Sequence, residues 1–284
     1  MYSNRIVAFI DMLGTTDKML SQTVSFEEAF GILNRFENVI QDFDGHFSMQ
    51  MEMFNQTVSK SDKTEFRFDG NKMNITFFSD NVVWSYPIDE VKIKYELFID
   101  RILSFFHLVQ TVFLQDDIMT RGGVSIGDLH QQGNKVFGVG LVFAHLGEQK
   151  ANYPRILIDK KIIDKCELKF VHFFDKFISY DKRVKHYYID IFKYLSFRVD
   201  LMNRDKQFAE TLQSATENEV SRFVKTINKG LLHKKIKVRL KYFWLYQQAN
   251  KYSNLKPFIK SSALVKLNFF QIKKYQIAKI IFRG

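Results

Sequence analysis

Apolar and polar residues alternate along the first part of the chain in patterns typical of strands and amphipathic helices. Residues 5–10 form a mostly apolar run that predicts a buried strand ending at Asp11 and Gly14. From Ser25 onward, apolar residues recur every three or four positions, which predicts a helix that ends near Gly45. Two short β-prone runs flank Ser79, Asp80 and Asn81, and this arrangement predicts a hairpin with Asp80 at its tip.

The same patterns continue to residue 159. They predict a long helix, a strand with two early glycines, a short strand that leads into another helix, and a last strand, at residues 90–116, 119–128, 135–138, 138–150 and 155–159. Gly122 and Gly123 would let another backbone come close to their strand, or would absorb a bulge. The resulting order, β-α-β-β-α-β-(β)-α-β, predicts an α+β fold with a ferredoxin-like core, a mixed sheet with helices on one face. In that topology the first strand is central and the hairpin lies beside it.

The pattern changes after residue 159. Residues 173–194 are aromatic and basic without a clear period, whereas residues 200–228 and 234–250 predict helices. The 284 residues are enough for one large domain or two small ones. Because of the change in pattern, we divide the chain into an α+β domain over residues 1–159 and a basic, mostly helical extension over residues 160–284.

Composition excludes several classes of protein. Hydrophobic residues make up 46% and charged residues 26%, as in a folded globular protein. The single cysteine, Cys166, excludes a disulfide framework and a cysteine zinc site, and it suits a reducing compartment. We find neither a basic leader followed by a long apolar run nor a stretch of about 18 uncharged apolar residues. The chain is therefore predicted to be cytoplasmic and without a transmembrane segment.

The net charge of +11 is distributed unevenly. Residues 1–159 carry 14 Lys and Arg against 21 Asp and Glu, whereas residues 160–284 carry 28 against 10, and no acid follows Glu219. This basic surplus could serve an anionic ligand, nucleic acid, an acidic membrane surface or the acidic N-terminal part. A charge run of this kind is usually a solvated face, so nucleic-acid binding is not expected.

Asp11 and Asp80 are the candidate metal ligands. Both lie at the ends of predicted strands that are neighbours in the sheet, so their carboxylates should lie close together. Two metal ions at such a spacing can support in-line phosphoryl transfer. The backbone amides of Leu13, Gly14 and Thr15 could bind a phosphate beside them.

Several segments of this region together resemble the class III nucleotidyl cyclases. Residues 9–14, Phe-Ile-Asp-Met-Leu-Gly, are similar to the F-x-D-x-x-G motif of that family, and residues 78–80, Phe-Ser-Asp, are similar to its second metal acid. Residues 121–128 and 136–138 resemble its later strand and glycine hairpin. Together with residues 153–156, Tyr-Pro-Arg-Ile, these motifs are similar to those of the pyrimidine cyclases of the Pycsar anti-phage systems, which also carry a C-terminal extension.

The resemblance implies that the 3′-hydroxyl of a nucleoside triphosphate attacks its own α-phosphorus and displaces pyrophosphate. It further implies two divalent cations, Mn²⁺ or Mg²⁺, held by Asp11, Asp80 and the carbonyl of Ile10, and phosphates bound by the amides of residues 12–15. A homodimer is implied as well, because sites of this class form at a subunit interface. The cyclic product would act as a second messenger on a downstream effector in phage defence.

The departures from the family pattern bear on substrate and activity. Thr76 or Phe77, and Val139, stand where purine-specific enzymes place a Lys and an Asp or Thr, so the base is predicted to be a pyrimidine, UTP before CTP. Val142 and Leu146 replace the usual Asn and Arg, so the catalytic cation must come from elsewhere. Its candidates are Arg121, Lys150 and Arg155. The alternatives are a purine cyclase that makes cAMP or cGMP, and an inactive cyclase-like protein that binds a nucleotide or nucleic acid.

Overall fold

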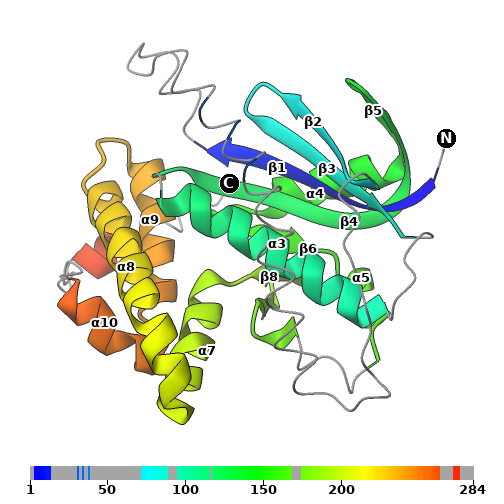
Figure 1. Ribbon diagram of the computed structural model, residues 1–284. Coiled ribbons are helices and arrows are strands. Elements are labelled where there is room, and N and C mark those ends of the chain that lie inside the picture. The colour runs from blue at the N-terminus through cyan, green and yellow to red at the C-terminus, as the bar shows by residue number, and fades with distance from the viewer. Residues whose placement is uncertain are drawn as a thin grey trace. The chain divides into compact units, whose positions relative to one another are not determined.

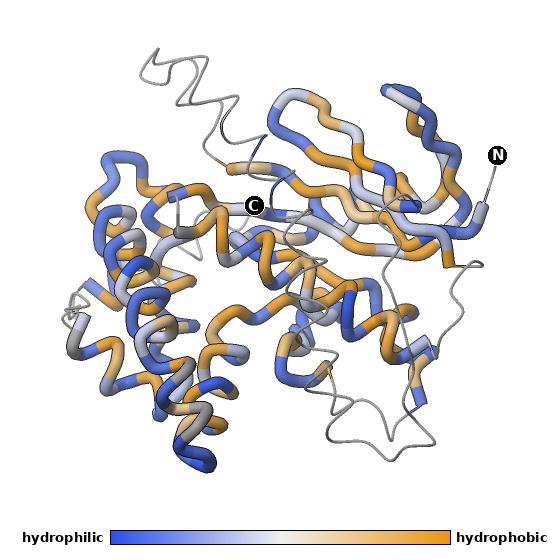
Figure 2. The backbone as a smooth tube through the Cα atoms, viewed as in Figure 1, coloured by the Kyte–Doolittle hydropathy of each residue, from blue (hydrophilic) through white to orange (hydrophobic). Residues whose placement is uncertain are grey.

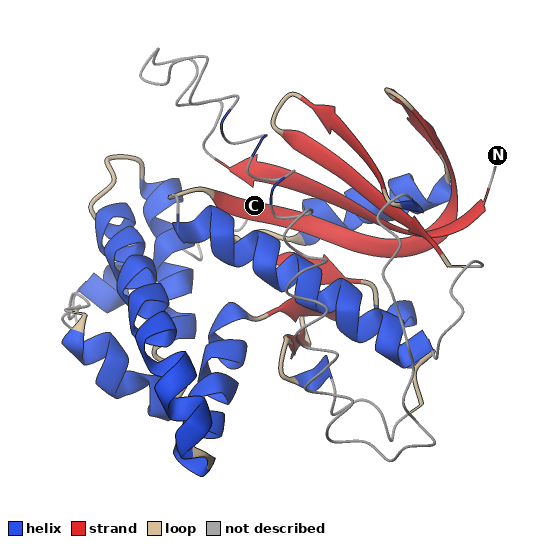
Figure 3. Cartoon of the chain, in the orientation of Figure 1, coloured by secondary structure: helices blue, strands red, loops and turns tan. Residues whose placement is uncertain are grey.

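The computed structural model describes residues 3–13, 72–88, 95–115, 117–167, 174–262 and 271–275, together with residues 31, 34 and 38. The chain forms two compact units, one of residues 1–112 and 118–189 and the other of residues 113–117 and 190–284. The described part of the first unit combines strands and helices, whereas that of the second is helical (Figure 3). The first unit contains β1 (Ser3–Leu13), β2 (Asn74–Phe78), β3 (Asn81–Pro87), most of α3 (Tyr95–Gln115), β4 (Met119–Gln132), β5 (Lys135–Phe137), α4 (Val139–Lys150), β6 (Ile156–Ile158), α5 (Lys160–Asp164), β7 (Ile178–Asp181) and β8 (His186–Ile189).

The strands form one sheet in the order β2-β3-β1-β4-β6-β8-β7, and β5 pairs with β4 (Figure 1). The pairing of β4 with β6 is parallel and the others are antiparallel, so the sheet is mixed. β1 lies between β3 and β4, and β2 flanks β3. The predicted α+β class, the central first strand and the adjacent hairpin are therefore confirmed.

Helices α3 and α4 cover opposite faces of the sheet (Figure 1). Trp84 of β3 stacks on Phe105 of α3 with ring centroids 5.4 Å apart. The preceding residue, Val83, is buried with Val7 of β1 and Ala144 of α4. Because successive side chains of a strand point to opposite faces, these contacts place α3 and α4 on different sides. The structure therefore differs from the prediction that helices cover one face of the sheet. The central strands are apolar on both faces, so both faces need a helix against them.

Helix α3 supplies most of the core on its side of the sheet. Phe98, Ile102, Phe105 and Val109 are buried, as the periodicity predicts. By length and composition the stretch Tyr95–Leu114 is apolar enough to cross a bilayer, but 89% of it is buried inside the structure. Figure 2 shows the hydrophobic residues that run along this helix and the central strands. Burial of this kind is typical of the core helix of a globular domain.

The second unit contains α7 (Ile191–Arg204), α8 (Lys206–Leu231), α9 (Ile236–Ala249), a short 3₁₀ turn η4 (Ser253–Leu255) and α10 (Lys256–Ser261). Phe192 of α7 packs edge-on against Phe223 of α8, with centroids 6.0 Å apart. The compact units divide after Ile189, whereas the sequence-based division falls after Asp159. The reason is that β8 pairs with β6 and so continues the same sheet. A catalytic role for residues 1–159 stays a prediction.

Most predicted elements are found, with different ends. β1 continues through Leu13, and β4 continues to Gln132, beyond the predicted Asp128. The hairpin turn consists of Ser79 and Asp80, and Asn81 already belongs to β3. Of the predicted helix after Ser25, residues 31, 34 and 38 are helical and the others lie outside the described residues.

Candidate functional site

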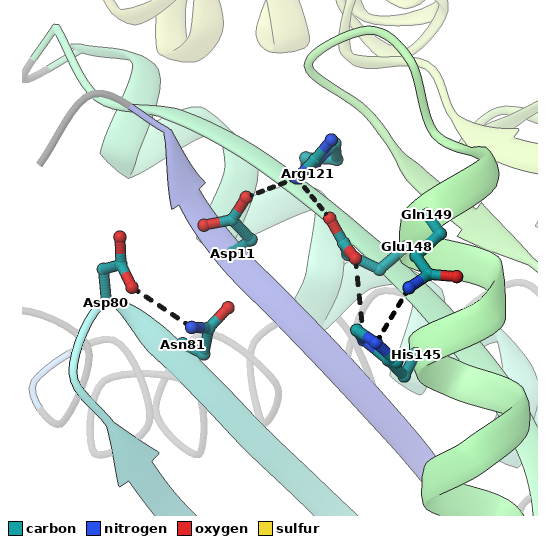
Figure 4. Close-up of polar contacts among 7 residues, drawn as sticks. All are labelled: Asp11, Asp80, Asn81, Arg121, His145, Glu148 and Gln149. Atoms are coloured by element: carbon teal, nitrogen blue, oxygen red, sulfur yellow. Dashed lines mark hydrogen bonds and ion pairs between the residues drawn. The ribbon is translucent and has the colours of Figure 1, made fainter. Parts of the chain in front are cut away.

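The sheet brings the two predicted metal acids onto adjacent strands. Asp11 of β1 lies opposite Asn81 of β3 on one side and opposite Arg121 of β4 on the other. Asp80 occupies the hairpin turn directly before Asn81, and its carbonyl oxygen accepts a hydrogen bond of 3.0 Å from the amide of Met12. Asn81 Nδ2 in turn donates to Asp80 Oδ1 at 3.1 Å (Figure 4). The topology thus places both acids on neighbouring parts of the sheet, as the sequence predicts, although Asp11 lies within β1 and not at its end. Metal binding by them stays a prediction.

Asp11 forms an ion pair with Arg121, the first of the predicted catalytic cations. Arg121 Nη2 donates a hydrogen bond of 2.8 Å to Asp11 Oδ2. The same nitrogen lies 2.6 Å from Oε1 of Glu148, so one guanidinium joins two carboxylates (Figure 4). Its side chain is 29% exposed, against 5% for Glu148. The side chain of Arg121 is therefore partly exposed to solvent, while it is paired with the buried carboxylate of Glu148.

Glu148 is a buried carboxylate at the end of α4. Burial raises its pKa, Arg121 opposes the rise, and the charge of Asp11 adds to it. His145, one turn earlier on α4, lies 3.7 Å from Glu148 Oε2 and is within 3.1 Å of Gln149 Nε2 through its other ring nitrogen. The edge of the His145 ring also meets Phe9 of β1. Asp11, Arg121, Glu148 and His145 thus form one polar chain on the face of the sheet that α4 covers.

Glycines bring α4 close enough for this chain to form. A Cβ atom on Gly123 of β4 would overlap the Ala144 carbonyl of α4 and would lie 2.6 Å from the amide of Glu148. Further along the same strand, a Cβ atom on Gly127 would lie 2.7 Å from the amide of Gly140. The predicted close approach of a second backbone to Gly123 is confirmed. This close packing determines the distance of Glu148 from β4 and so allows its contact with Arg121.

The predicted phosphate-binding amides do not all remain available. Because β1 continues through Leu13 instead of ending at Asp11, the amide of Met12 donates to the Asp80 carbonyl within the sheet. This corrects the expectation that Met12 would bind a phosphate. Leu13 is the last residue of β1, opposite Met119, while Gly14 and Thr15 lie outside the described residues.

The Ile10 carbonyl, the predicted backbone ligand of a metal ion, lies inside the sheet. Ile10 is fully buried in β1, opposite Val82 of β3 and Gly122 of β4. Since Met12 hydrogen-bonds to Asp80, the alternation of an antiparallel pair makes Ile10 and Val82 the next hydrogen-bonded pair. The carbonyl is then used inside the sheet with one of its two lone pairs, and metal binding by it stays a prediction.

The carboxylates of Asp11 and Asp80 do fit a hard divalent cation, because Mg²⁺ and Mn²⁺ prefer oxygen ligands. Within the described ranges, no group of three or more His, Cys, Asp or Glu side chains could hold a metal ion by itself. Two carboxylates alone leave most coordination positions to water and substrate, as in sites where Mg²⁺ binds with phosphates. The residues present therefore suit a cation that arrives together with a nucleotide.

Arg155, the other predicted catalytic cation, is a buried structural residue. Its Nη1 donates to Asp181 Oδ2 of β7 at 2.8 Å, and its guanidinium lies over the ring of Tyr188, 5.0 Å from the centroid. Burial raises the pKa of Asp181, but hydrogen bonds from Arg155 and from the amide of Arg183 outweigh it, so that the pKa is lowered. This ion pair accounts for the burial of Arg155, and a catalytic role for it stays a prediction.

Sequence reasoning missed Glu148 as the anchor of Arg121 and Asp181 as the partner of Arg155. The small residues Gly123 and Gly147 are a signal that could have placed the end of α4 beside β4. No comparable signal precedes Asp181, which lies on a short strand in a region without a clear period.

Helix α4 presents an apolar face to solvent. Val142 and Leu146, which stand at the expected Asn and Arg positions, are 55% and 43% exposed. Val139 and Phe143 are exposed beside them, and the spacing of three and four residues puts all four on one side of the helix. Exposed apolar residues gathered in this way are typical of an interaction surface.

No protein-family model matches the chain, and no curated protein matches it significantly. Several solved structures are similar to it. One is the monomeric guanylyl cyclase domain of the RhoGC fusion protein from the aquatic fungus Blastocladiella emersonii, with 12% identity, a TM-score of 0.39, and coverage of 66% of this chain and 95% of that one. Another is the adenylyl cyclase CyaB from P. aeruginosa, with 14% identity, a TM-score of 0.36, and coverage of 66% and 94%. Similarity at this level assigns neither a substrate nor a reaction to this chain.

Proposed function

We propose that this chain is a nucleotide cyclase that converts a pyrimidine nucleoside triphosphate, UTP or else CTP, to its 3′,5′-cyclic monophosphate and pyrophosphate. The observation that carries the proposal is that Asp11 lies on the strand beside the turn that holds Asp80, and that Arg121 pairs with Asp11. Two carboxylates on neighbouring parts of a sheet, with a cation beside them, suit a triphosphate and its divalent metals.

Each residue has a distinct role in this proposal. Asp11 and Asp80 supply carboxylate oxygens to two Mn²⁺ or Mg²⁺ ions, which would acidify the 3′-hydroxyl and neutralise the triphosphate. The guanidinium of Arg121 would exchange its hydrogen bond to Asp11 for hydrogen bonds to phosphate oxygens. Its ion pair with Glu148 would hold it near the site during this exchange. The amides of Gly14 and Thr15 remain the proposed phosphate contacts, whereas that of Leu13 faces Met119 of β4 in the sheet.

The proposed choice of a pyrimidine base rests on Thr76 and Val139. Thr76 is buried, and its hydroxyl already donates to the Gly133 carbonyl and accepts from Gln131. Val139 has no side-chain donor or acceptor. Neither residue can therefore read the edge of a purine by hydrogen bonds, which favours a smaller base.

The exposed apolar face of α4 supports a homodimer, in which Val139, Val142, Phe143 and Leu146 would be covered by a second copy. As part of the same proposal, the protein acts in the cytoplasm during phage defence. Its cyclic product is then a second messenger that binds a separate effector.

The test is incubation of the purified full chain with ATP, GTP, CTP or UTP and Mn²⁺, with products identified by mass spectrometry. We expect cyclic UMP, or cyclic CMP, as the main product. Asp11→Asn and Asp80→Asn should each abolish it, whereas Asp128→Asn, an exposed acid of β4, should not. A purine cyclic nucleotide as the only product would refute the pyrimidine assignment and leave the purine cyclase.

A second candidate function is binding without turnover. It is favoured by the apolar residues Val142 and Leu146, which cannot stabilise the transition state at the positions where purine cyclases carry Asn and Arg. This candidate predicts that a nucleoside triphosphate binds but that none of the four is cyclised. It also predicts that Asp11→Asn leaves the biological effect of the protein intact.

A further inference from the structure

The turn between α8 and α9 exposes a leucine among basic residues. Leu232 is 81% exposed, more than any other large hydrophobic side chain in the described part of the chain. Its neighbour Leu231 is buried. The turn follows Leu231, the last residue of α8, and leads into α9, and Figure 2 shows it as mostly hydrophilic. A single apolar side chain therefore projects from a polar turn.

Cations surround this leucine in the sequence and on the surface. The exposed basic residues of the turn and the adjoining helix ends are Lys225, Lys229, His233, Lys234, Lys235 and Lys237. Acids of α8 lie toward its other end, at Glu210 and Glu217, and no acid follows Glu219 in the sequence. Asp117, which pairs with Lys229, offsets one of these charges. The turn is thus the basic end of the second unit.

The conformation of the turn is held by its own contacts. The amide of His233 donates to the Gly230 carbonyl at 3.1 Å, and the amide of Lys235 donates to His233 Nδ1 at 3.1 Å. Gly230 lies against the ring of Tyr242, where a Cβ atom would overlap the ring. The hydroxyl of Tyr275 donates to the Leu231 carbonyl. The outward position of Leu232 is therefore built into the turn.

From these observations we propose that the turn between α8 and α9 docks on an anionic lipid bilayer. Leu232 inserts between the headgroups, and the surrounding lysines bind the lipid phosphates. An exposed apolar side chain among basic residues allows both apolar insertion and electrostatic attraction to anionic headgroups. These two forces together hold peripheral proteins on such a surface. The helix dipole of α9 adds a partial positive charge at its N-terminus, beside the turn. No acid in the first turn of α9 offsets this charge.

Other partners fit these residues less well. Single-stranded nucleic acid would use the lysines together with aromatic side chains on which bases stack, and it gains nothing from an exposed leucine. A stable protein interface needs a much larger apolar patch than one side chain. The membrane is the partner that uses both the leucine and the lysines, and its binding is independent of the proposed cyclase reaction.

The test is co-sedimentation of the purified full chain with vesicles of phosphatidylcholine, with or without phosphatidylserine, at an ionic strength of about 0.1 M. We expect binding only when phosphatidylserine is present. Combined Lys234→Gln, Lys235→Gln and Lys237→Gln should weaken it about 100-fold, and Leu232→Ser about tenfold. The matched control replaces Lys135, Lys165 and Lys182, three exposed lysines of the first unit, with Gln and should change it little.

Three results would overturn the proposal. One is a lack of dependence on phosphatidylserine, either because the chain sediments equally with both kinds of vesicle or because it sediments with neither. Another is full binding by the Leu232→Ser variant, which would leave only a charged face without insertion. The third is lysine-dependent binding to a single-stranded oligonucleotide that Leu232→Ser does not affect, in the absence of vesicle binding, which would assign the turn to nucleic acid.

Discussion

The guanidinium of Arg121 lies 2.6 Å from the carboxylate of Glu148, and the close approach of α4 to β4 makes this contact possible. Glu148 therefore positions the cation that the proposed reaction needs. Replacing Glu148 with Gln removes the charge and keeps the shape. We expect turnover of the preferred triphosphate to fall about 10- to 100-fold, because a misplaced cation loses most of its effect.

The Glu148→Gln variant should remain folded, and its nucleotide affinity should change less than its turnover. The control is Gln149→Ala, an exposed neighbour whose hydrogen bond goes to His145. Unchanged turnover in Glu148→Gln would show that Glu148 does not position Arg121.

The two predicted catalytic arginines should respond differently to substitution. Arg121→Ala should lower turnover about 100- to 1,000-fold, because it removes a partly exposed cation beside the proposed phosphate site. Arg155→Met should instead lower the free energy of unfolding by about 3–5 kcal/mol, because it leaves the Asp181 carboxylate without its buried partner. Steady-state rates and urea unfolding separate the two effects. Loss of turnover without loss of stability in Arg155→Met would restore it as a catalytic candidate.

A methyl group on Gly123 should disturb both the fold and the site. Gly123→Ala forces the strand against the Ala144 carbonyl and the Glu148 amide, so α4 must move away from β4. We expect the free energy of unfolding to fall by about 1–3 kcal/mol and turnover to fall with it. Gly31→Ala is a suitable control, because a Cβ atom there meets nothing within 4 Å. Equal behaviour of the two variants would contradict the close packing of α4.

The exposed face of α4 is open to a direct test of the proposed homodimer. Val142→Glu puts a charge in the middle of this face, and it should raise the dissociation constant of the dimer about tenfold or more. Sedimentation velocity over a range of protein concentrations measures this shift. Lys150→Glu, at the exposed end of the same helix, serves as the charge control. A wild-type chain that is monomeric at all concentrations would refute the dimer.

Glu219 should make stability depend on pH. It pairs with Arg198 inside the second unit, and burial raises its pKa although Arg198 opposes the rise. A carboxylate whose folded-state pKa is raised contributes stability below its unfolded pKa and loses it as the pH rises through the folded pKa. The free energy of unfolding of the wild type should therefore fall relative to Glu219→Gln as the pH rises above the ordinary range for Glu.

Urea unfolding of both proteins at a series of pH values measures this difference. The exposed Glu217 on the same helix provides the control substitution, Glu217→Gln. A difference that stays constant with pH, or that changes in the opposite direction, would mean that burial does not control the titration of Glu219.

The sequence alone determined the strands that surround Asp11 and Asp80 and the neighbourhood of these two acids. Both follow from the pattern of elements along the chain. Apolar periodicity distinguishes strands from helices, and the predicted order of strands and helices puts the hairpin with Asp80 beside the first strand. The close approach at Gly123 was predictable for the same reason, because a glycine pair inside a strand leaves space for another backbone.

Only the tertiary structure decided which charges meet. Arg121 could have been catalytic or structural by sequence, and its contacts with Asp11 and Glu148 depend on three elements that are far apart along the chain. The partner of Arg155 is on β7, and Leu231 and Leu232 differ in burial although they are adjacent and identical. Side-chain type fixes what a residue can bind, but long-range packing fixes what lies within its reach. That is why the two candidate metal ligands were visible in the sequence, whereas Glu148, which pairs with Arg121, was not.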